Sequence, residues 1–265
     1  MKKIVCLLLF TTLCVEGKSQ GDFDNAVKKY YGGELNTAID LLTKCIDNKE
    51  NVPQAYMYRG AARAFLGNFD GAFKDLQTSL QLDSANDKIY YYMGKAYLLN
   101  QQYKLAADYF KKSIQEKSND PDRYDALATA EIFSENYKSA IESETHAIQL
   151  DSMQSIFLQN RGFAELKLGY FEKAVRDLSR SLSLDKSYKG YFDRALAYSQ
   201  MKMYTVAIED FNASLSIKPD NAEALYYRGL VLEYMGKTSE GCQDFSRSLE
   251  LGFTDAAKSI KVYCK

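Results

Sequence analysis

The chain has 265 residues, of which 46% are hydrophobic and 26% are charged, and its formal net charge is −1. This composition is typical of a globular protein with enough apolar side chains for a continuous core. The chain is close to neutral and contains no basic stripe, which disfavours nucleic-acid binding. We therefore expect no nucleic-acid partner.

Residues 1–19 have the pattern of a secretion signal. Two lysines precede an apolar run at residues 4–15, which is too short to span a bilayer comfortably. Small residues allow cleavage after Ser19 or after Gly17, and we prefer Ser19 because the first repeat begins there. We expect an exported protein, periplasmic or extracellular, with no integral membrane segment after signal removal. The alternatives are an uncleaved signal that anchors the chain in a membrane and lipid modification of Cys14.

From Ser19 onward the chain falls into seven rows of about 34 residues. A fixed period in this range is typical of a solenoid of stacked units. Three positions in the row hold small residues, which let two helices approach closely. Position 8 holds Ala26, Gly60, Gly94, Ala128, Gly162, Ala195 and Gly229; position 20 holds Ala38, Ala72, Ala106, Ala140, Ala174, Ala207 and Gly241; position 27 holds Cys45, Ser79, Ser113, Ala147, Ser181, Ser214 and Ser248.

Each row predicts two helices, because apolar residues recur at spacings of three and four and no useful β-alternation occurs. Glycine marks the turn between them in four rows, at Gly33, Gly67, Gly169 and Gly236. The predicted domains are a signal peptide at 1–19, a solenoid at 20–253 and a C-terminal capping helix at 254–265. The predicted repeats are 19–52, 53–86, 87–120, 121–154, 155–187, 188–221 and 222–253.

Aromatic residues complete the repeat pattern. Position 4 holds Tyr56, Tyr90, Tyr124, Leu158, Tyr191 and Leu225 in rows two to seven. Together with the small positions, this pattern resembles the tetratricopeptide repeat (TPR) over nearly all of residues 19–253. The resemblance implies an all-α fold, a right-handed α-solenoid or superhelix of about seven helix–turn–helix repeats. It also implies a protein-binding scaffold whose first helices line a concave groove.

The resemblance places positions 2, 5, 6, 9, 12 and 13 of each row on this groove. Here these positions supply aromatic and charged side chains, which suit the binding of a segment of another protein. The alternative is that many of the rings pack between neighbouring repeats. The predicted protein-binding groove consists of Tyr58, Tyr91, Tyr92, Lys95, Asn160, Phe192, Tyr226 and Tyr227.

Two further positions vary together. Four rows carry arginine at position 7 and aspartate at position 23, and the three rows that lack the arginine also lack the aspartate. We infer structural ion pairs between the two helices of a repeat, because removing one partner of a buried pair costs about 3–5 kcal/mol. The alternative role for these arginines is ligand binding. The predicted pairs are Arg59–Asp75, Arg161–Asp177, Arg194–Asp210 and Arg228–Asp244.

The cysteines suggest a covalent link near the C-terminus. Cys242 lies in the last repeat and Cys264 in the predicted capping helix, and an exported chain can keep disulfides. We predict a Cys242–Cys264 disulfide bond that ties the cap to the solenoid, with two unrelated buried thiols as the alternative. Cys45 occupies a small packing position and is expected to be a buried thiol.

No motif in the chain points to catalysis. His146 is the only histidine and belongs to no cluster with ligand spacing, so neither a metal nor a cofactor is expected. The G-x-S-x-G letters at residues 17–21 lie at the predicted cleavage point and lack the strand that a hydrolase elbow requires. One TPR subfamily binds acidic tails through a carboxylate clamp. That clamp is absent here, because Asp125 and Asp193 stand where a lysine and an arginine are required.

The sequence therefore favours a non-enzymatic scaffold or adaptor. Its expected partners are other proteins or peptide segments, bound in the groove in an extracytoplasmic compartment. The alternatives are a structural module that associates with itself and a regulatory subunit of a cell-envelope or secretion complex. The pattern predicts no particular oligomeric state.

Overall fold

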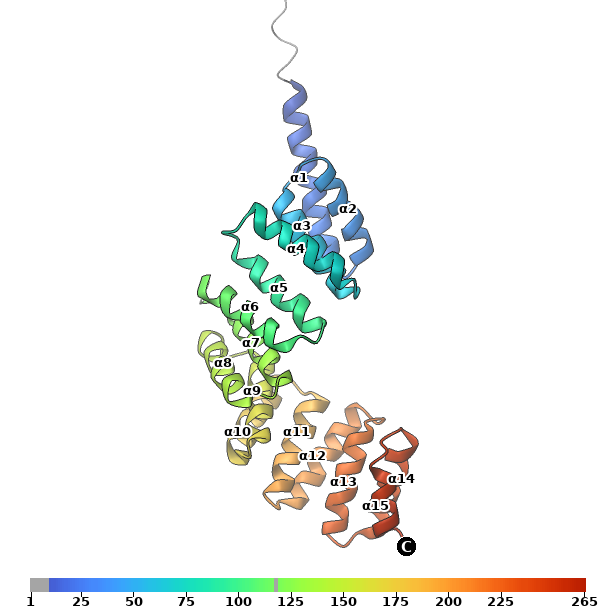
Figure 1. Ribbon diagram of the computed structural model, residues 1–265. Coiled ribbons are helices and arrows are strands. Elements are labelled where there is room, and N and C mark those ends of the chain that lie inside the picture. The colour runs from blue at the N-terminus through green and yellow to red at the C-terminus, as the bar shows by residue number, and fades with distance from the viewer. Residues whose placement is uncertain (1–9, 117–118) are drawn as a thin grey trace, which may run out of the picture. The chain divides into compact units, whose positions relative to one another are not determined.

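The computed structural model describes residues 10–116 and 119–265. Over these residues the chain forms fifteen α-helices and no β-strand (Figure 1). The all-α solenoid architecture expected from the sequence is confirmed, since the helices follow one another in pairs joined by short turns. The chain divides into two compact units, up to Ser134 and from Glu135 on, each of which is described by itself.

The helices match the predicted rows closely. Unit 1 contains α1 (Phe10–Tyr31), α2 (Leu35–Asp47), α3 (Val52–Phe65), α4 (Phe69–Leu82), α5 (Asp87–Leu99), α6 (Tyr103–Glu116) and α7 (Pro121–Phe133). Unit 2 contains α8 (Tyr137–Leu150), α9 (Ser155–Lys167), α10 (Phe171–Leu184), α11 (Tyr188–Gln200), α12 (Tyr204–Ile217), α13 (Ala222–Tyr234), α14 (Thr238–Glu250) and α15 (Ala256–Tyr263).

The two helices of a repeat pack closely because position 8 has little or no side chain. A Cβ atom added at Gly94 would lie 2.7 Å from the ring of Phe110, on the second helix of the same repeat. Real Cβ atoms do not approach other atoms so closely, so α5 and α6 pack at a distance that glycine alone allows. The same conflict would arise at Gly60, Gly162 and Gly229, where the Cβ would lie 2.9, 2.8 and 2.7 Å from the nearest side-chain atom.

The turn between the two helices requires a left-handed backbone at position 15. The four predicted turn glycines have φ angles from 75° to 79°, which confirms their role. Three rows place a residue with a side chain in the same conformation, which is unfavourable for such residues. These are Gln101, Glu135 and Lys202, with φ angles of 58°, 60° and 60°.

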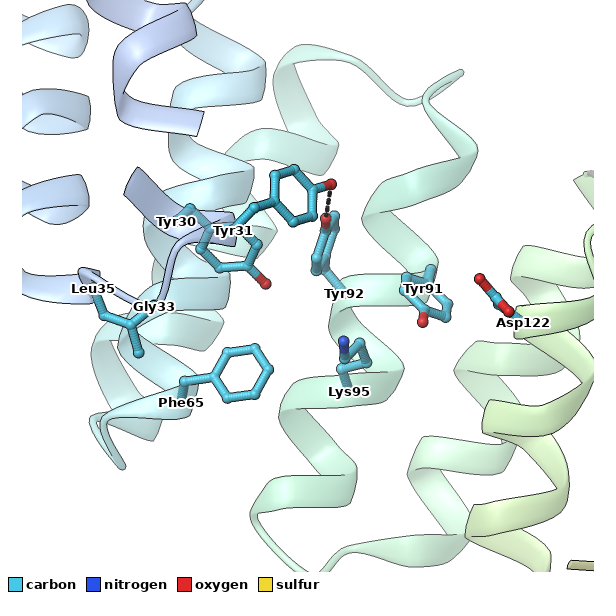
Figure 2. A pocket seen from close by; sticks show the side chains of 9 residues that line it. All are labelled: Tyr30, Tyr31, Gly33, Leu35, Phe65, Tyr91, Tyr92, Lys95 and Asp122. Carbon is cyan, nitrogen blue, oxygen red and sulfur yellow. Dashed lines mark hydrogen bonds between the residues drawn. The ribbon is translucent and has the colours of Figure 1, made fainter. Parts of the chain in front are cut away.

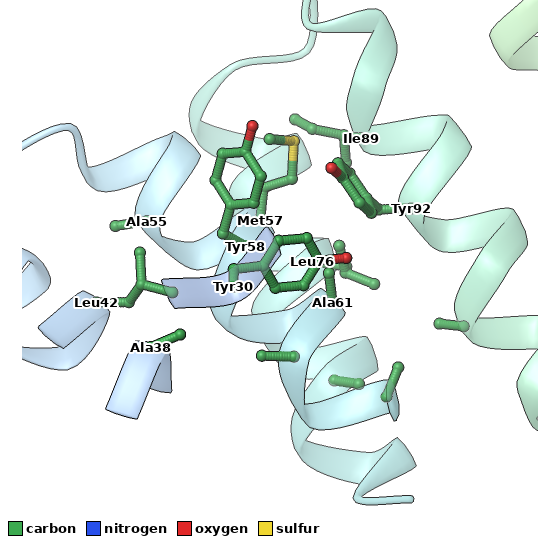
Figure 3. Close-up of a cluster of buried hydrophobic side chains, with 14 of the residues drawn as sticks. Tyr30, Ala38, Leu42, Ala55, Met57, Tyr58, Ala61, Leu76, Ile89 and Tyr92 are labelled. Atoms are coloured by element: carbon green, nitrogen blue, oxygen red, sulfur yellow. The ribbon is translucent and has the colours of Figure 1, made fainter. Parts of the chain in front are cut away.

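Each unit has its own apolar core between the paired helices. In unit 1 the core includes Leu42, Met57, Leu76 and Ile89, none of them more than 1% exposed (Figure 3). In unit 2, Phe211 occupies a comparable place and is fully buried. Alanines fill the contacts between these larger side chains, as the small positions of the repeat require.

The four arginines at position 7 each hold the aspartate of their own repeat through two hydrogen bonds. Nε donates to one carboxylate oxygen and Nη2 to the other, and this bidentate geometry is the stronger form of the pair. The carboxylates are largely buried, with the side chains of Asp75 and Asp244 3% and 9% exposed. The Nε–oxygen distances are 2.8 Å for Arg59–Asp75, 2.5 Å for Arg161–Asp177, 2.7 Å for Arg194–Asp210 and 2.7 Å for Arg228–Asp244.

The same arginines also bind the preceding repeat, a contact that our sequence analysis did not include. Nη1 of each arginine donates to a short polar side chain at position 25 of the row before, so that one guanidinium group joins three helices. The rows that precede Met93 and Leu127, where the arginine is missing, carry Gln77 and Lys111 at this position. The four acceptors are Thr43 (3.0 Å), Thr145 (3.1 Å), Ser179 (2.9 Å) and Asn212 (2.7 Å).

In the third repeat, aromatic rings stand where the ion pair is missing. Tyr109 replaces the aspartate of position 23, and its ring stacks on Tyr97 with centroids 5.1 Å apart. Tyr97 in turn contacts Phe73 of the preceding repeat at 4.4 Å. The three rings therefore link two repeats by apolar packing, as the arginine does elsewhere by hydrogen bonds.

A buried arginine joins the third repeat to the fourth. Arg123 on α7 is 3% exposed and donates to the carbonyl oxygen (2.7 Å) and hydroxyl (2.6 Å) of Ser113 on α6. Its guanidinium also pairs with Asp87 and, at 3.2 Å, with Asp120. A lone arginine at position 3 carries no repeat signal, which explains why the sequence did not reveal it.

The C-terminal segment forms the expected extra helix. α15 packs on α14, and the ring of Tyr263 lies 6.1 Å from that of Phe245. Cys242 and Cys264 face each other with Cα atoms 5.7 Å apart, a separation that suits a disulfide. Cys45 is buried in α2, and burial raises the pKa of its thiol.

The predicted signal peptide falls only partly within the described residues, since residues 1–9 lie outside them. Residues 10–19 belong to α1, which continues through the expected cleavage point after Ser19. In the part of the chain that the structure describes, no helix combines the length and the apolar character needed to cross a bilayer.

We expect Asp75→Ala to lower the free energy of unfolding by about 3 kcal/mol, because it leaves the Arg59 guanidinium without its carboxylate in a largely buried site. Arg63, which also contacts Asp75 at 2.6 Å, loses the same partner. Urea denaturation followed by circular dichroism measures this change. The control is Gln77→Ala, on the exposed side of the same helix, which should alter stability by less than about 0.5 kcal/mol. A loss equal to that of the control would show that the pair contributes nothing.

Candidate functional site

A hollow of about 460 Å³ opens between the first helices of unit 1 (Figure 2). Helices α1, α3, α5 and α7 all contribute side chains to it, as expected if first helices form the binding surface. Aromatic rings make up most of its wall, and one lysine and one aspartate are the charged groups among its lining residues. The lining residues are Tyr30, Tyr31, Gly33, Leu35, Phe65, Tyr91, Tyr92, Lys95 and Asp122.

The tyrosines beside the hollow pack on one another edge to face. The ring of Tyr58 lies 5.4 Å from Tyr30 and 5.7 Å from Tyr92, and these three side chains are at most 7% exposed. The hydroxyl groups of Tyr31 and Tyr92 are 3.3 Å apart, within hydrogen-bonding distance. Burial raises the pKa of Tyr91 to about 12 and also raises the pKa of Tyr92, so both phenols stay protonated at neutral pH. The wall is therefore rigid and offers hydroxyl groups.

Lys95 lies between two rings at the centre of the hollow (Figure 2). Its Nζ atom is 5.3 Å from the ring centroid of Phe65 and 5.4 Å from that of Tyr91, which are cation–π distances. Burial lowers the pKa of Lys95, because the apolar surroundings disfavour the charged form. Within the described residues no carboxylate forms an ion pair with it. A half-buried ammonium group thus faces the hollow.

Unit 2 presents a different surface on its first helices. The Nζ atoms of Lys167 and Lys189 lie 5.2 and 5.1 Å from the ring centroid of Phe163. Asp193 is 2% exposed, and its Oδ2 atom accepts no hydrogen bond from the residues that the structure describes. Burial raises the pKa of Asp193 to about 7, against the opposing effect of Lys189.

The eight predicted groove residues take up different environments. Tyr91, Tyr92 and Lys95 line the hollow, whereas Tyr58 packs in the ring cluster beside it. The other four predicted residues lie in unit 2. Phe192 is 8% exposed and packs on Phe211 and Tyr227, and Tyr226 contacts Phe253 with ring centroids 4.9 Å apart. Asn160 is half-buried.

Our predicted set omitted five side chains that line the hollow, of which Leu35, at position 17 of the first row, lies outside the groove positions and the other four lie on them. Tyr30 and Tyr31 occupy positions 12 and 13 of the first row, which is the weakest match to the repeat, and Phe65 occupies position 13 of the second. Asp122 occupies position 2 of the fourth row. All four positions belong to the groove set, so the same position rule applied to every row would have found them.

Two family models, both described as tetratricopeptide repeat, match residues 59–121 and 188–221. The small positions, the helix pairs and these matches agree. The chain contains tetratricopeptide repeats. The number of described helices, fifteen, fits about seven repeats.

Among curated proteins, the TPR segment resembles the DnaJ homolog subfamily C member 7 homolog of Dictyostelium discoideum. The two are 27% identical over 208 residues, which cover 71% of this chain and 38% of the relative. The chain thus spans well under half the length of that protein.

Two solved structures share the TPR fold at low sequence identity. The C-terminal part of a TPR repeat-containing protein from Cytophaga hutchinsonii aligns with a TM-score of 0.66 and 20% identity, covering 89% of this chain and 98% of that one. YrrB, described as a TPR protein with an unusual peptide-binding site, aligns with a TM-score of 0.60 and 22% identity, covering 71% and 97%. At these identities the likeness shows the fold alone.

We expect the stability of unit 2 to depend on pH through Asp193. The pKa of this carboxyl group is about 7 in the folded protein and near 4 in an unfolded chain. Between these values the folded protein binds a proton that the unfolded chain releases, so the free energy of unfolding falls as the pH rises. Asp193→Asn should remove this dependence. Between about pH 4 and about pH 7 the free energy of unfolding of the variant should rise by up to about 4 kcal/mol relative to that of the wild type. Urea denaturation at about pH 4 and about pH 8 tests this; an equal change in both proteins would contradict it.

Proposed function

We propose that the protein is a non-enzymatic interaction scaffold that binds a segment of another protein on the first helices of its TPR repeats. The observation that carries the proposal is the aromatic hollow of unit 1, with Lys95 half-buried at its centre. A hollow lined by rings, phenol hydroxyls and a few charges is suited to recognise side chains of a peptide segment. The peptide-binding site named for YrrB, which has the same fold, supports this reading.

The exposed rings supply contact area without holding the fold together. Tyr31 and Phe65 are 68% and 46% exposed, so each presents apolar surface that a bound segment would cover. The buried Tyr58 and Tyr92 contact Tyr31, and the buried Tyr30 contacts Phe65. Binding to such preformed rings requires little ordering of the scaffold.

The double variant Tyr31→Ser, Phe65→Ser is expected to lose peptide binding. Peptides are first selected from a displayed random library on the full chain, and their dissociation constants are measured by fluorescence anisotropy. The variant should bind at least about tenfold more weakly, because aromatic anchor residues contribute on the order of 2 kcal/mol each.

The control is Leu105→Ser, Tyr170→Ser, which removes one leucine and one tyrosine that are 43% and 44% exposed, lie outside the groove positions and do not line the hollow. Equal binding by both double variants, with helicity retained, would contradict the proposal. Light scattering of the peptide-free chain tests the alternative of self-association, which predicts a concentration-dependent mass.

We also propose that the chain is exported and that Cys242 and Cys264 form a disulfide bond in the mature protein. The signal-like residues 1–19 and the 5.7 Å separation of the two Cα atoms support this. Protein isolated from its native cells should begin after Ser19 and should react with a thiol reagent at Cys45 alone, and only after unfolding. An N-terminus at Met1, with Cys242 and Cys264 both alkylated without reductant, would contradict the proposal. Mass spectrometry of the unreduced protein gives both results.

A further inference from the structure

Lys95 forms no ion pair with a carboxylate in the described part of the chain, although Asp122 in the same lining acts on its charge from a distance. It is the one basic side chain among the residues that line the hollow, and the neighbouring rings of Phe65 and Tyr91 offer only their faces. A partly desolvated ammonium group is unfavourable without a counter-charge, and a bound anion would remove that cost. The Lys95 end of the hollow is therefore complementary in charge to a carboxylate, whereas the Asp122 end is not.

Phenol groups lie beside Lys95 on the wall of the hollow. The hydroxyls of Tyr31 and Tyr92 share one hydrogen bond across 3.3 Å, and either of them can be its donor. The Tyr92 hydroxyl is also a hydrogen-bond partner of Tyr30 and Tyr58 in this ring cluster. These phenols therefore satisfy one another, and the ammonium group of Lys95 is the cationic group that an anion in the hollow would meet.

Asp122 limits how much negative charge the hollow accepts. It lies on the opposite side of Tyr91 from Phe65 (Figure 2), and its carboxylate would repel a second acidic group placed there. Lys95 lies between Phe65 and Tyr91, so a carboxylate that reaches its ammonium group also meets the surface of these rings. The chemistry suits a single acidic residue next to an apolar one, and it disfavours a run of acidic residues.

We propose that this hollow binds an internal glutamate or aspartate side chain of a partner segment, with its carboxylate on Lys95 and a neighbouring apolar side chain on Phe65 and Tyr31. The inference rests on the proposed scaffold function and names the chemistry of its partner. Lys95 lies midway along the hollow, with walls continuing from α1 and α3 on one side and to α7 on the other. A segment that crosses it therefore continues in both directions, which selects an internal acidic residue over a C-terminal carboxylate.

A double-mutant cycle tests the contact. The probe is the tightest peptide from the library selection, amidated at its C-terminus, together with its variant in which glutamine or asparagine replaces the acidic residue. Both are titrated against the wild type and Lys95→Met. We expect each single change to weaken binding about tenfold and the two together to weaken it little further, because they remove the same interaction. Lys95→Arg should retain most of the affinity.

The matched control is Lys112→Met. Lys112 lies over the ring of Tyr109, with Nζ 4.9 Å from the centroid, but does not line the hollow, so its loss should leave peptide affinity and the cycle unchanged. A selected peptide that contains no acidic residue, or two changes whose effects simply multiply, would overturn the inference. So would a peptide whose binding requires a free C-terminal carboxylate.

These outcomes are distinct from failure of the scaffold function. If peptides bind and lose affinity with Tyr31→Ser, Phe65→Ser but not with Lys95→Met, the groove is a binding site and the acidic contact is wrong. If no peptide depends on Tyr31 and Phe65, the proposed function itself fails, and the inference fails with it.

Discussion

The close approach of the two helices within each repeat is the constraint on which the rest of the structure depends. At Gly94 and Gly229 an added Cβ would lie 2.7 Å from a phenylalanine ring of the facing helix. The large residue that faces position 8 is thus buried against backbone, and the two helices of such a repeat pack in close contact. Because a single pair cannot bury both of its faces, the pairs must stack. Within unit 1 the first helices then lie beside one another, and side chains from α1, α3, α5 and α7 line one hollow.

Neighbouring repeats are joined by two different kinds of interaction. Where arginine occupies position 7, its guanidinium group binds the aspartate of its own repeat and a short polar side chain of the preceding one, as Arg194 does with Asp210 and Ser179. In the third repeat the stacked rings of Tyr97 and Tyr109 stand in the same place. The guanidinium group can satisfy five donors in a fixed plane, whereas rings fill the same space without hydrogen bonds. Either solution leaves the groove positions free to vary.

The repeat period, the helix pairs and the turn glycines could be predicted from the sequence because each rests on local geometry repeated in every row. The pairing of Arg161 with Asp177 was also accessible, since the two residue types occur in the same rows. The burial of Tyr58 and Phe192 could not be predicted from the sequence, because a ring at position 5 or 6 packs according to the side chains of the adjacent repeat. Arg123 was missed for a related reason: its partners lie on α6 and at two helix N-termini, and a contact made once leaves no periodic trace.

The two units show how one repeat can present different chemistry. In unit 1, position 9 of the third row is Lys95. Position 6 of the same row is Tyr92, whose hydroxyl lies close to that of Tyr31. In unit 2, position 9 of the fifth row is Phe163, and the ammonium groups of Lys167 and Lys189 lie over its ring. Position 6 of the next row is the buried Asp193. None of these residues occupies position 8, 20 or 27, where size decides whether the helices pack. The chemistry of the first helices can therefore change row by row while the packing of the helices stays the same.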